Sequence, residues 1–355
     1  MKVSCGRRIE KSQVQRILIR ATNWVGDAVM TLPALEAVRE NFPTSHITVL
    51  AKPWVAPLFE NHPAVDRVLV FDKGNGARAG FVEMLRVSRF IRKERFELAI
   101  LFQNAFEAAL LTFFGRVKQR VGYKTDGRGF MLTHGVPRTE KVLGIHQVGY
   151  YCAILRAVGW PAEDRDPVLH MGREVREQAV GILKSNGVDS RDFIVGLSPG
   201  AVFGSAKRWP PERFSEIGDR VVERWGARVV VFGSGGERAI GDRVCEAMKH
   251  EALNLCGKTS LRVAMGAMSL CRFFVTNDSG LMHTASALGL PTVAVFGSTD
   301  HVTTGPRGPN ARIVRCAALC APCLKQECPT DHRCMLDITP EMVWETMEAL
   351  RRDVF

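Results

Sequence analysis

The sequence predicts an α/β protein made of two Rossmann-like domains. Three observations lead to this prediction: the chain has 355 residues, short apolar runs alternate with helical patterns, and this alternation stops once and then restarts. A length of 355 residues suits two domains of roughly 100–200 residues each. Strands that alternate with helices are typical of parallel sheets covered by helices.

In the N-terminal half, short apolar runs predict the strands of a buried parallel sheet. These strands are expected at Arg16–Ala21, Ile47–Leu50, Val68–Phe71 and Leu98–Phe102. The helices between them are expected to begin near Ala28, Trp54, Phe81 and Ala105.

The same alternation restarts after Asp192 and predicts a second sheet. Its strands are expected at Phe193–Leu197, Arg228–Phe232, Phe273–Thr276 and Thr292–Phe296. Its helices are expected near Glu212, Glu237, Leu261 and Leu281.

The segment Trp160–Pro167 breaks the periodicity with two prolines and several acidic residues, as a linker does. We therefore expect domains at 1–170 and 171–340, followed by a tail helix at 341–355. Open parallel sheets bind ligands at the carboxyl ends of their strands. We expect both domains to present these ends to a cleft between them.

Composition places the chain among ordinary globular proteins, because 46% of its residues are hydrophobic and 24% are charged. These values exclude disordered and collagen-like chains. No apolar run reaches the roughly 18 residues of a spanning helix, and the first thirty residues carry charges but no apolar core of a signal peptide. We therefore expect a cytoplasmic protein.

The formal net charge of +11 indicates an anionic partner. Residues 1–165 carry 25 Lys and Arg against 15 Asp and Glu, whereas residues 166–355 carry 23 against 22. The excess positive charge therefore belongs almost entirely to the first domain. Within it, Phe81–Phe96 mixes apolar and basic residues and predicts either a membrane-surface helix or an ordinary helix with a solvated basic face.

The turn Thr276–His283 follows an apolar run and precedes a helical stretch. A helix N-terminus with free N–H groups and a glycine favours a bound pyrophosphate. An ordinary capped helix is the alternative.

The segment Gly200–Pro210 likewise follows a strand and carries Lys207 and Arg208, which suit phosphate or are simply a solvated basic pair. It matches neither a Walker P-loop nor the dinucleotide fingerprint.

Asp27 follows the first predicted strand and directly precedes a helix. A carboxylate in that place suits a general base that takes a proton from an attacking hydroxyl. A plain helix cap is the alternative.

Several segments together resemble the lipopolysaccharide heptosyltransferases of glycosyltransferase family nine, and within them the heptosyltransferase II group. The resemblance extends over nearly the whole chain. It is carried by ILIRATNWVGDAVMTLPAL at 17–35, GAVFGSAKRWP at 200–210 and TNDSGLMHTASAL at 276–288, with RVGYKTDGRGFMLTH at 120–134 and DITPE at 337–341 in support.

The resemblance implies a GT-B fold in which the first domain binds the acceptor and the second binds ADP-heptose. It implies an inverting transfer of L-glycero-D-manno-heptose from ADP-heptose to the first heptose of the lipopolysaccharide inner core, with no cofactor required for catalysis. Heptosyltransferase I or III activity is the alternative within the family. A nucleotide-sugar epimerase and a nucleic-acid-binding protein are the alternatives outside it, although no nucleic acid is expected as a partner.

Residue by residue, Asp27 matches the family's general base and Lys207 the lysine on the donor phosphates. The positions that match the loop holding ADP and the sugar, followed by two looser matches to nucleotide contacts, are Asp278, Ser279, Gly280, Leu281, His283, Thr259 and Glu237. The GT-B fold also allows the tail helix after Pro340 to cross back onto the first domain.

The implied acceptor is a lipid A that bears Kdo and heptose at the inner face of the inner membrane. Such an acceptor is anionic, so the basic first domain is expected to capture both it and the anionic membrane surface. Arg120, Lys124 and Arg128 are the predicted acceptor contacts.

Five of the ten cysteines lie within nineteen residues near the C-terminus. A cytosolic location argues against disulfides. The spacing of Cys320, Cys323, Cys328 and Cys334 suits a structural tetrahedral zinc site, and a loop of reduced thiols is the alternative.

Overall fold

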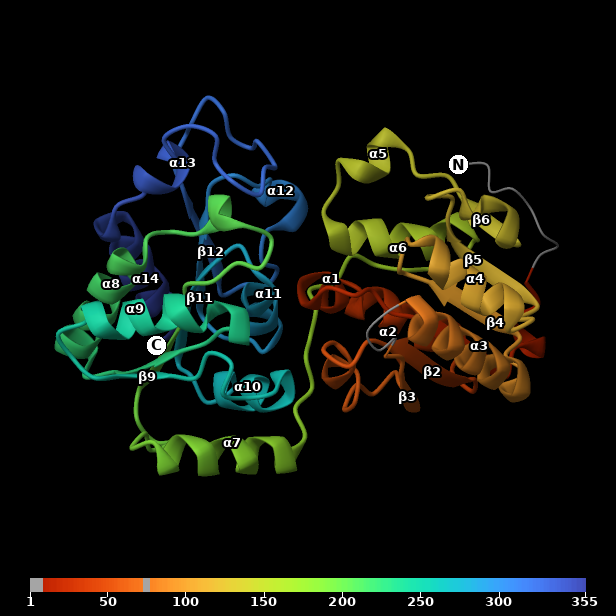
Figure 1. Ribbon diagram of the computed structural model, residues 1–355, viewed down its shortest axis with the longest axis horizontal. Helices are drawn as coiled ribbons and strands as arrows, with labels where there is room; N and C mark the ends of the chain where they lie inside the picture. Colours follow the sequence, from red (N-terminus) through yellow and green to blue (C-terminus); the bar gives the residue numbers. More distant parts are fainter. Residues whose placement is uncertain (1–8, 73–76) are drawn as a thin grey trace. The chain divides into compact units, whose positions relative to one another are not determined.

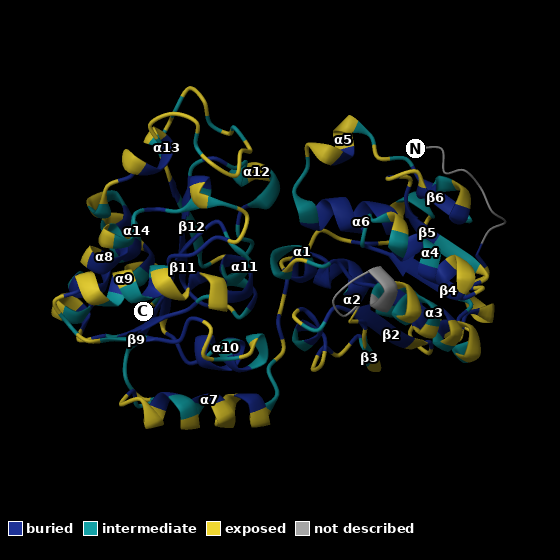
Figure 2. Cartoon of the chain, in the orientation of Figure 1, coloured by how far each residue is buried: buried dark blue, intermediate teal, exposed yellow. Residues whose placement is uncertain are grey.

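The computed structural model describes residues 9–72 and 77–355. The start of the segment inspected for a signal peptide lies outside these residues. The chain divides into two compact units, unit 1 over Met1–His170 and unit 2 over Met171–Phe355. Each unit is an α/β layer structure with buried strands and helices whose outer faces are exposed (Figure 1, Figure 2).

Unit 1 is built on a six-stranded sheet in which all pairs are parallel and the order is β3-β2-β1-β4-β5-β6. The strands are β1 (Arg16–Arg20), β2 (His46–Ala51), β3 (Arg67–Val70), β4 (Leu98–Leu101), β5 (Gln119–Tyr123) and β6 (His134–Val136).

Helices cover both faces of this sheet. Helices α3 and α4 contact each other, and their apolar residues share one core with the strand residues Leu18 and Leu101. Successive strand residues point to opposite faces, and Ile17 and Ile19 are as fully buried as Leu18. The helices are α1 (Val25–Met30), α2 (Leu32–Asn41), α3 (Ala77–Glu94), α4 (Phe106–Phe114), α5 (Glu140–Leu143) and α6 (Gln147–Ala157), with short 3-10 turns η1 (Lys11–Gln13), η2 (Ala56–Leu58) and η3 (Arg128–Met131).

Unit 2 is built on a second six-stranded parallel sheet, in the order β12-β11-β10-β7-β8-β9. The strands are β7 (Ile194–Ser198), β8 (Arg228–Val231), β9 (Ala252–Asn254), β10 (Phe273–Asn277), β11 (Thr292–Phe296) and β12 (Ala311–Arg315).

Two separate apolar cores lie on the two faces of this sheet. One joins Val195 and Leu197 to residues of α8, α9 and α14, and the other joins Ile194 to residues of α7, α10 and α11. The helices are α7 (Arg173–Ser185), α8 (Pro211–Trp225), α9 (Arg238–Ala247), α10 (Leu261–Met268), α11 (Gly280–Ala287), α12 (His301–Thr304), α13 (Arg333–Leu336) and α14 (Pro340–Val354), with 3-10 turns η4 (Ser205–Lys207) and η5 (Gly235–Glu237).

The tail helix α14 packs within unit 2. Its apolar stripe, Val343, Met347 and Leu350, is buried in the core shared with α8. The rings of Trp344 and Trp225 lie 5.2 Å apart, which fixes the helix against α8.

All eight predicted strands are present, each within one or two residues of its expected bounds. The helix expected near Trp54 is not formed, and the segment contains only the turn η2, because Pro53 and Pro57 remove backbone donors. Strands β5, β6, β9 and β12 were not predicted.

The segment expected to be a linker, Trp160–Pro167, has no regular secondary structure but is fastened to unit 1. Trp160 packs edge-on against Phe42 with ring centroids 4.9 Å apart. The Asn41 side-chain amide donates to the Pro161 carbonyl at 2.8 Å. Unit 1 therefore extends to His170.

Within the described parts of the chain, none of the helices combines the length and the apolar character that crossing a bilayer requires.

Candidate functional site

In both units the strand order reverses next to the first strand. The reversal lies between β1 and β4 in unit 1 and between β7 and β10 in unit 2. Open parallel sheets bind ligands outside the carboxyl ends of the strands at such a switch point. Asp27 follows β1, Lys207 follows β7 and Asp278 follows β10, so these three predicted residues lie at the two switch points.

Asp27 lies in the first turn of α1, where a carboxylate is stabilised by the helix dipole. The preceding loop is held by two side chains: Arg20 donates to the Asn23 Oδ1 atom at 2.9 Å, and Trp54 donates through Nε1 to the Asn23 carbonyl at 2.7 Å. The Arg20 side chain is buried, and burial lowers its pKa to about 10. These two hydrogen bonds therefore fix the conformation of the loop that precedes Asp27.

A polar cavity of about 230 Å³ in unit 1 has Asp27 in its wall. The Tyr151 hydroxyl donates to Asp27 Oδ1 at 3.4 Å. Burial and the Asp27 charge raise the pKa of Tyr151 well above its usual value, so this hydroxyl stays protonated. The cavity is lined by Thr22, Asp27, Phe102, Gln103, Asn104, Arg138, Leu143, Gln147, Tyr150 and Tyr151.

A second tyrosine in the cavity wall is fixed by neighbours from other elements. The Asn104 side-chain amide donates to the Tyr150 hydroxyl at 2.8 Å. Burial raises the pKa of Tyr150, and hydrogen bonds from Asn104 and Arg138 oppose that rise. Arg138 brings a cation into the cavity that holds the Asp27 carboxylate.

The three residues predicted to contact the acceptor differ in their surroundings. Arg128 is fully buried, and it donates to the carbonyls of Tyr123, Gln103 and Ala105, so it supports the wall of the cavity rather than facing a ligand. This burial argues against its predicted role as an acceptor contact.

Arg120 is also occupied by the protein itself. It lies near the amino end of β5, away from the carboxyl ends where Asp27 lies, and its Nε donates to the Met131 carbonyl at 2.5 Å. Its guanidinium lies over the Phe113 ring, 5.4 Å from the centroid. Lys124 follows the carboxyl end of β5 and is exposed, so it alone of the three is placed to meet a ligand.

In unit 2, Lys207 and Asp278 form a buried ion pair. The Lys207 Nζ atom lies 2.7 Å from Asp278 Oδ2, and the two side chains are 14% and 5% exposed. The Thr299 hydroxyl donates to the same carboxylate oxygen at 2.6 Å. The ammonium also lies over the Phe203 ring, 4.8 Å from its centroid. The pair thus fixes the Lys207 ammonium at the switch point of this sheet, with its charge balanced by Asp278.

The predicted phosphate-binding turn is a capped helix N-terminus. Ser279 is the N-cap of α11, and its hydroxyl accepts from the Met282 N–H at 3.3 Å. Gly280 and Leu281 are the first two residues of the helix, while His283 is buried one turn further on. A capped N-terminus beside a lysine is an arrangement that binds anions.

Glu237 and Thr259 follow β8 and β9, the next two strands of the sheet. Glu237 is buried, and its Oε2 accepts from both the N–H and the hydroxyl of Ser234, which closes a capping box. A Cβ atom on Gly200 would lie 2.1 Å from Glu237 Oε1, so the glycine lets this carboxylate approach the loop after β7.

The four cysteines predicted as zinc ligands do not bring three or more sulfur atoms within 4.8 Å of one another, although Cys320, Cys323 and Cys328 are near enough to Cys334 to raise its pKa. Within 9–72 and 77–355, a single group of three or more His, Cys, Asp or Glu residues brings ligand atoms within 4.8 Å of one another, and it contains no cysteine. Burial raises the pKa of Cys334 to about 11, which keeps it a thiol. The structural zinc prediction is therefore not supported for Cys320, Cys323, Cys328 and Cys334.

The cysteine-rich segment, Cys316–Cys334, instead packs on the loop that carries Lys207. The Ala206 N–H donates to the Gln326 carbonyl at 3.0 Å, and His332 Nε2 lies 3.0 Å from the Ala206 carbonyl. A Cβ atom on Gly204 would lie 2.1 Å from the Gln326 carbonyl oxygen, so the glycine permits this contact.

Several residues of these sites were not predicted from the sequence. Tyr150, Tyr151 and Gln147 lie on α6, a helix that was not predicted, and Arg138 lies in the loop before α5. Thr299 could have been found, because it follows the predicted strand β11 at the same edge as Asp278.

Comparison with known proteins identifies the family. The model of glycosyltransferase family 9 (heptosyltransferase) matches residues 84–333. The lipopolysaccharide heptosyltransferase 2 of Salmonella typhimurium is 30% identical over 344 residues, which cover 94% of this chain and 98% of that protein. The lipopolysaccharide heptosyltransferase 1 of Pseudomonas aeruginosa is 25% identical over 94% and 98% of the two chains.

The solved structure of the E. coli ADP-heptose LPS heptosyltransferase II superimposes with a TM-score of 0.83, at 27% identity, over 96% of this chain and 99% of that one. The two Rossmann-like sheets are thus those of a GT-B enzyme, as expected. The chain belongs to glycosyltransferase family 9, the heptosyltransferases, and is a glycosyltransferase of lipopolysaccharide core biosynthesis.

Proposed function

We propose that the chain transfers L-glycero-D-manno-heptose from ADP-heptose to the first heptose of the lipopolysaccharide inner core, with inversion at the anomeric carbon. The observation that carries this proposal is the 30% identity to a heptosyltransferase 2 over nearly the whole of both chains. The heptosyltransferase 1 relative is less similar over the same share of the chain.

Asp27 is the proposed general base. Its carboxylate lines a cavity of unit 1 that has room for part of a sugar and offers polar groups from Asn104, Gln147 and Arg138. The Tyr151 hydroxyl donates to one oxygen and so holds the carboxylate in one orientation. A carboxylate held in this way can take the proton of an acceptor hydroxyl as that oxygen attacks.

Unit 2 is proposed to bind the ADP portion of the donor. The Lys207 ammonium has three N–H donors, so it can contact a diphosphate while it keeps its bond to Asp278. Asp278 and Thr299 then act as positioning residues for the ammonium. The N-terminus of α11 adds backbone N–H groups and the positive end of a helix dipole.

These groups account for every bond, electron pair and proton that moves in the proposed transfer. The acceptor oxygen forms a bond to the anomeric carbon as the bond from that carbon to the β-phosphate oxygen breaks, through a state with oxocarbenium character. The electron pair leaves with ADP, whose charge Lys207 stabilises, and the proton goes to Asp27. Fixed positive charge at the leaving group lowers the barrier because it is present before the charge develops.

The acceptor is proposed to be a Kdo- and heptose-bearing lipid A, held through its anionic groups. Arg138 in the cavity and Lys124 at the carboxyl end of β5 replace Arg120 and Arg128 as the proposed contacts.

The enzyme is proposed to work at the inner face of the inner membrane, attached through α3. Phe81 and Val82 on this helix are 57% and 60% exposed. Arg86, Arg89 and Lys93 continue the exposed stripe from Val82 at helical spacing. Apolar residues followed by cations suit an anionic lipid surface.

A panel of defined acceptors tests the proposal. Purified enzyme and ADP-heptose are incubated with lipid A–Kdo acceptors that carry no heptose, one heptose or two heptoses. The masses of the products are then measured by mass spectrometry. Transfer only to the acceptor with one heptose is expected. Transfer to the acceptor without heptose would assign heptosyltransferase I activity, and transfer only to the acceptor with two would assign heptosyltransferase III activity.

A further inference from the structure

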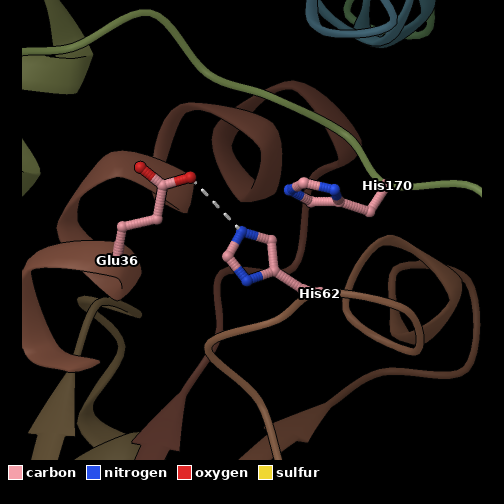
Figure 3. Close-up of side chains that lie close together, drawn as sticks. All are labelled: Glu36, His62 and His170. Carbon is pink, nitrogen blue, oxygen red and sulfur yellow. Dashed lines mark ion pairs between the residues drawn. The ribbon is translucent and has the colours of Figure 1, made fainter. Parts of the chain in front are cut away.

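A cluster of three potential metal ligands lies in unit 1 outside the proposed catalytic site. Glu36 comes from α2, His62 follows the turn η2, and His170 is the last residue of the unit. One ligand atom from each lies within 4.8 Å of the other two, and Figure 3 shows the three side chains converging from separate segments.

His62 is the buried member of this cluster. Its side chain is 0% exposed, and its Nε2 atom has no hydrogen-bond partner. The nearest charged atom is Glu36 Oε1 at 3.8 Å, which is too far for a hydrogen bond (Figure 3). A buried polar nitrogen without a partner is costly and rare in folded proteins. This nitrogen is turned toward a carboxylate and a second imidazole, which are metal ligands.

We propose that Glu36, His62 and His170 bind one divalent transition-metal ion, with zinc as the ion that this ligand set suits best. Two imidazole nitrogens and one carboxylate oxygen form a common zinc ligand set that leaves a fourth position for water. The site is independent of the proposed transfer reaction, because none of the three residues lines the Asp27 cavity.

The hydrogen bond that His62 accepts determines which of its ring nitrogens carries the proton. The Ala64 N–H donates to Nδ1 at 3.2 Å, which leaves the ring proton on Nε2. Binding a metal at Nε2 moves this proton to Nδ1, so the Ala64 N–H loses its acceptor, and the bonds to the metal must exceed that cost.

The two outer ligands have the freedom to close on the ion. Ligand atoms in a tetrahedral zinc site lie roughly 3.4 Å apart, given zinc–ligand distances of about 2.0–2.1 Å. The ligand atoms lie within 4.8 Å of one another, so the widest separation must shrink by at most about 1.4 Å. His170 is exposed and Glu36 is a long side chain at the surface, so both can move while His62 stays fixed.

The bound ion would fasten the end of unit 1 to its own helix α2. The segment before His170 already contacts this helix, because Arg165 pairs with Glu40 and the Pro161 carbonyl accepts from Asn41. A metal bridge from His170 to Glu36 would add a third attachment and stabilise the unit.

Titration of the metal-free full-length protein with Co²⁺ and Zn²⁺ tests the proposal. We expect one equivalent of Co²⁺ with visible d–d bands and no near-ultraviolet thiolate charge-transfer band. Competition with a chelator then gives the zinc affinity. His170→Gln and Glu36→Gln should each weaken it by at least about 100-fold, since loss of an outer-sphere partner alone costs 10–100-fold.

Two matched variants control the experiment. His46→Gln removes another exposed histidine of unit 1, and Cys323→Ser changes the cysteine-rich segment; both should leave the affinity unchanged. Zinc should also raise the melting temperature of the wild type and not that of His170→Gln. Equal zinc affinity of wild type, His170→Gln and Glu36→Gln, or no binding by any of them, would overturn the proposal. So would a thiolate band that Cys323→Ser removes.

Discussion

The two units have the same strand order but carry different side chains at the corresponding switch point. Counting β7–β12 as the first to the sixth strand of unit 2 gives the order 3-2-1-4-5-6, which is also the order of unit 1. At the switch point, unit 1 places the Asp27 carboxylate and unit 2 places the Lys207 ammonium in an ion pair with Asp278. The shared topology therefore sets where a ligand binds, and a few side chains after the strands set what is bound.

The units also differ in where their charge lies. Unit 2 is almost neutral and fixes Lys207 in a buried pair, whereas unit 1 carries the excess of positive charge and exposes much of it on α3. A buried, paired cation suits one small anionic ligand, and an exposed basic stripe suits an extended anionic surface. Variants in one unit should therefore change acceptor or membrane interactions, and variants in the other should change donor binding.

The largest effect is expected for Asp27→Asn. The amide keeps the shape of the side chain but cannot accept the proton, so kcat should fall by roughly 10²–10⁴. Calorimetry should show unchanged ADP affinity, because ADP is assigned to unit 2. Glu163→Gln, an exposed carboxylate of the same unit, is the control. A kcat within about threefold of the wild type would exclude Asp27 as the base.

Lys207→Ala should act on the donor side. Loss of a charge-assisted hydrogen bond costs about 1.5–3 kcal/mol, which corresponds to a loss of roughly 10–150-fold in kcat/KM for ADP-heptose, with weaker ADP binding in parallel. Lys184→Ala on the exposed surface of α7 should change neither quantity. Unchanged ADP affinity in Lys207→Ala would contradict the phosphate contact.

The double variant Arg89→Gln/Lys93→Gln should weaken binding to vesicles that contain anionic lipid by roughly 30-fold, at about 1 kcal/mol for each basic residue. The matched variant Arg173→Gln/Lys184→Gln removes two exposed cations from α7 of unit 2 and should have little effect. Binding that depends equally on both helices, or on neither, would remove α3 from this role.

The smallest effect is expected for Tyr151→Phe. The tyrosine hydroxyl donates to the ionised form of Asp27, and such a bond lowers the pKa of the carboxylate. Its removal should raise that pKa, and the effect should be small because the bond is long. The acid limb of the kcat/KM profile should move to higher pH. Tyr150→Phe, which loses only bonds to Asn104 and Arg138, should leave that limb in place.

The parts of the fold that the sequence predicts are those with strong local signals. Central strands such as β1 and β10 are continuous apolar runs, because helices bury both of their faces. Three of the four missed strands, β6, β9 and β12, lie at sheet edges, and the fourth, β5, is an interior strand whose sequence QRVGY mixes polar and apolar residues. Residues 134–136 and 252–254 form strands of three residues, which are too short for a periodic pattern, and pairing with a longer neighbour determines them.

The residues of the candidate sites also fall into two groups, those that a local sequence signal predicts and those that only the folded chain brings together. Asp27, Lys207 and Asp278 each follow a recognisable strand, so the sequence alone places them at the carboxyl edge of a sheet. Arg120 and Arg128 look like free cations in the sequence, but their donors are used by backbone carbonyls that only the folded chain brings near. Glu36, His62 and His170 meet only through tertiary structure, so no spacing in the sequence indicates them.

The contact between the cysteine-rich segment and the Lys207 loop has a consequence for synthesis on the ribosome. The Ala206 carbonyl meets His332, a residue that is made 126 positions later. All six strands of unit 1 end by Val136, so its sheet can form while most of unit 2 is still untranslated. The Lys207 loop, in contrast, lacks its packing partner until almost the last residues have left the exit tunnel. A chain shortened before residue 326 would therefore keep the residues of all strands of both sheets, but it would lose α14 from the core of unit 2 as well as the support of the loop that carries Lys207.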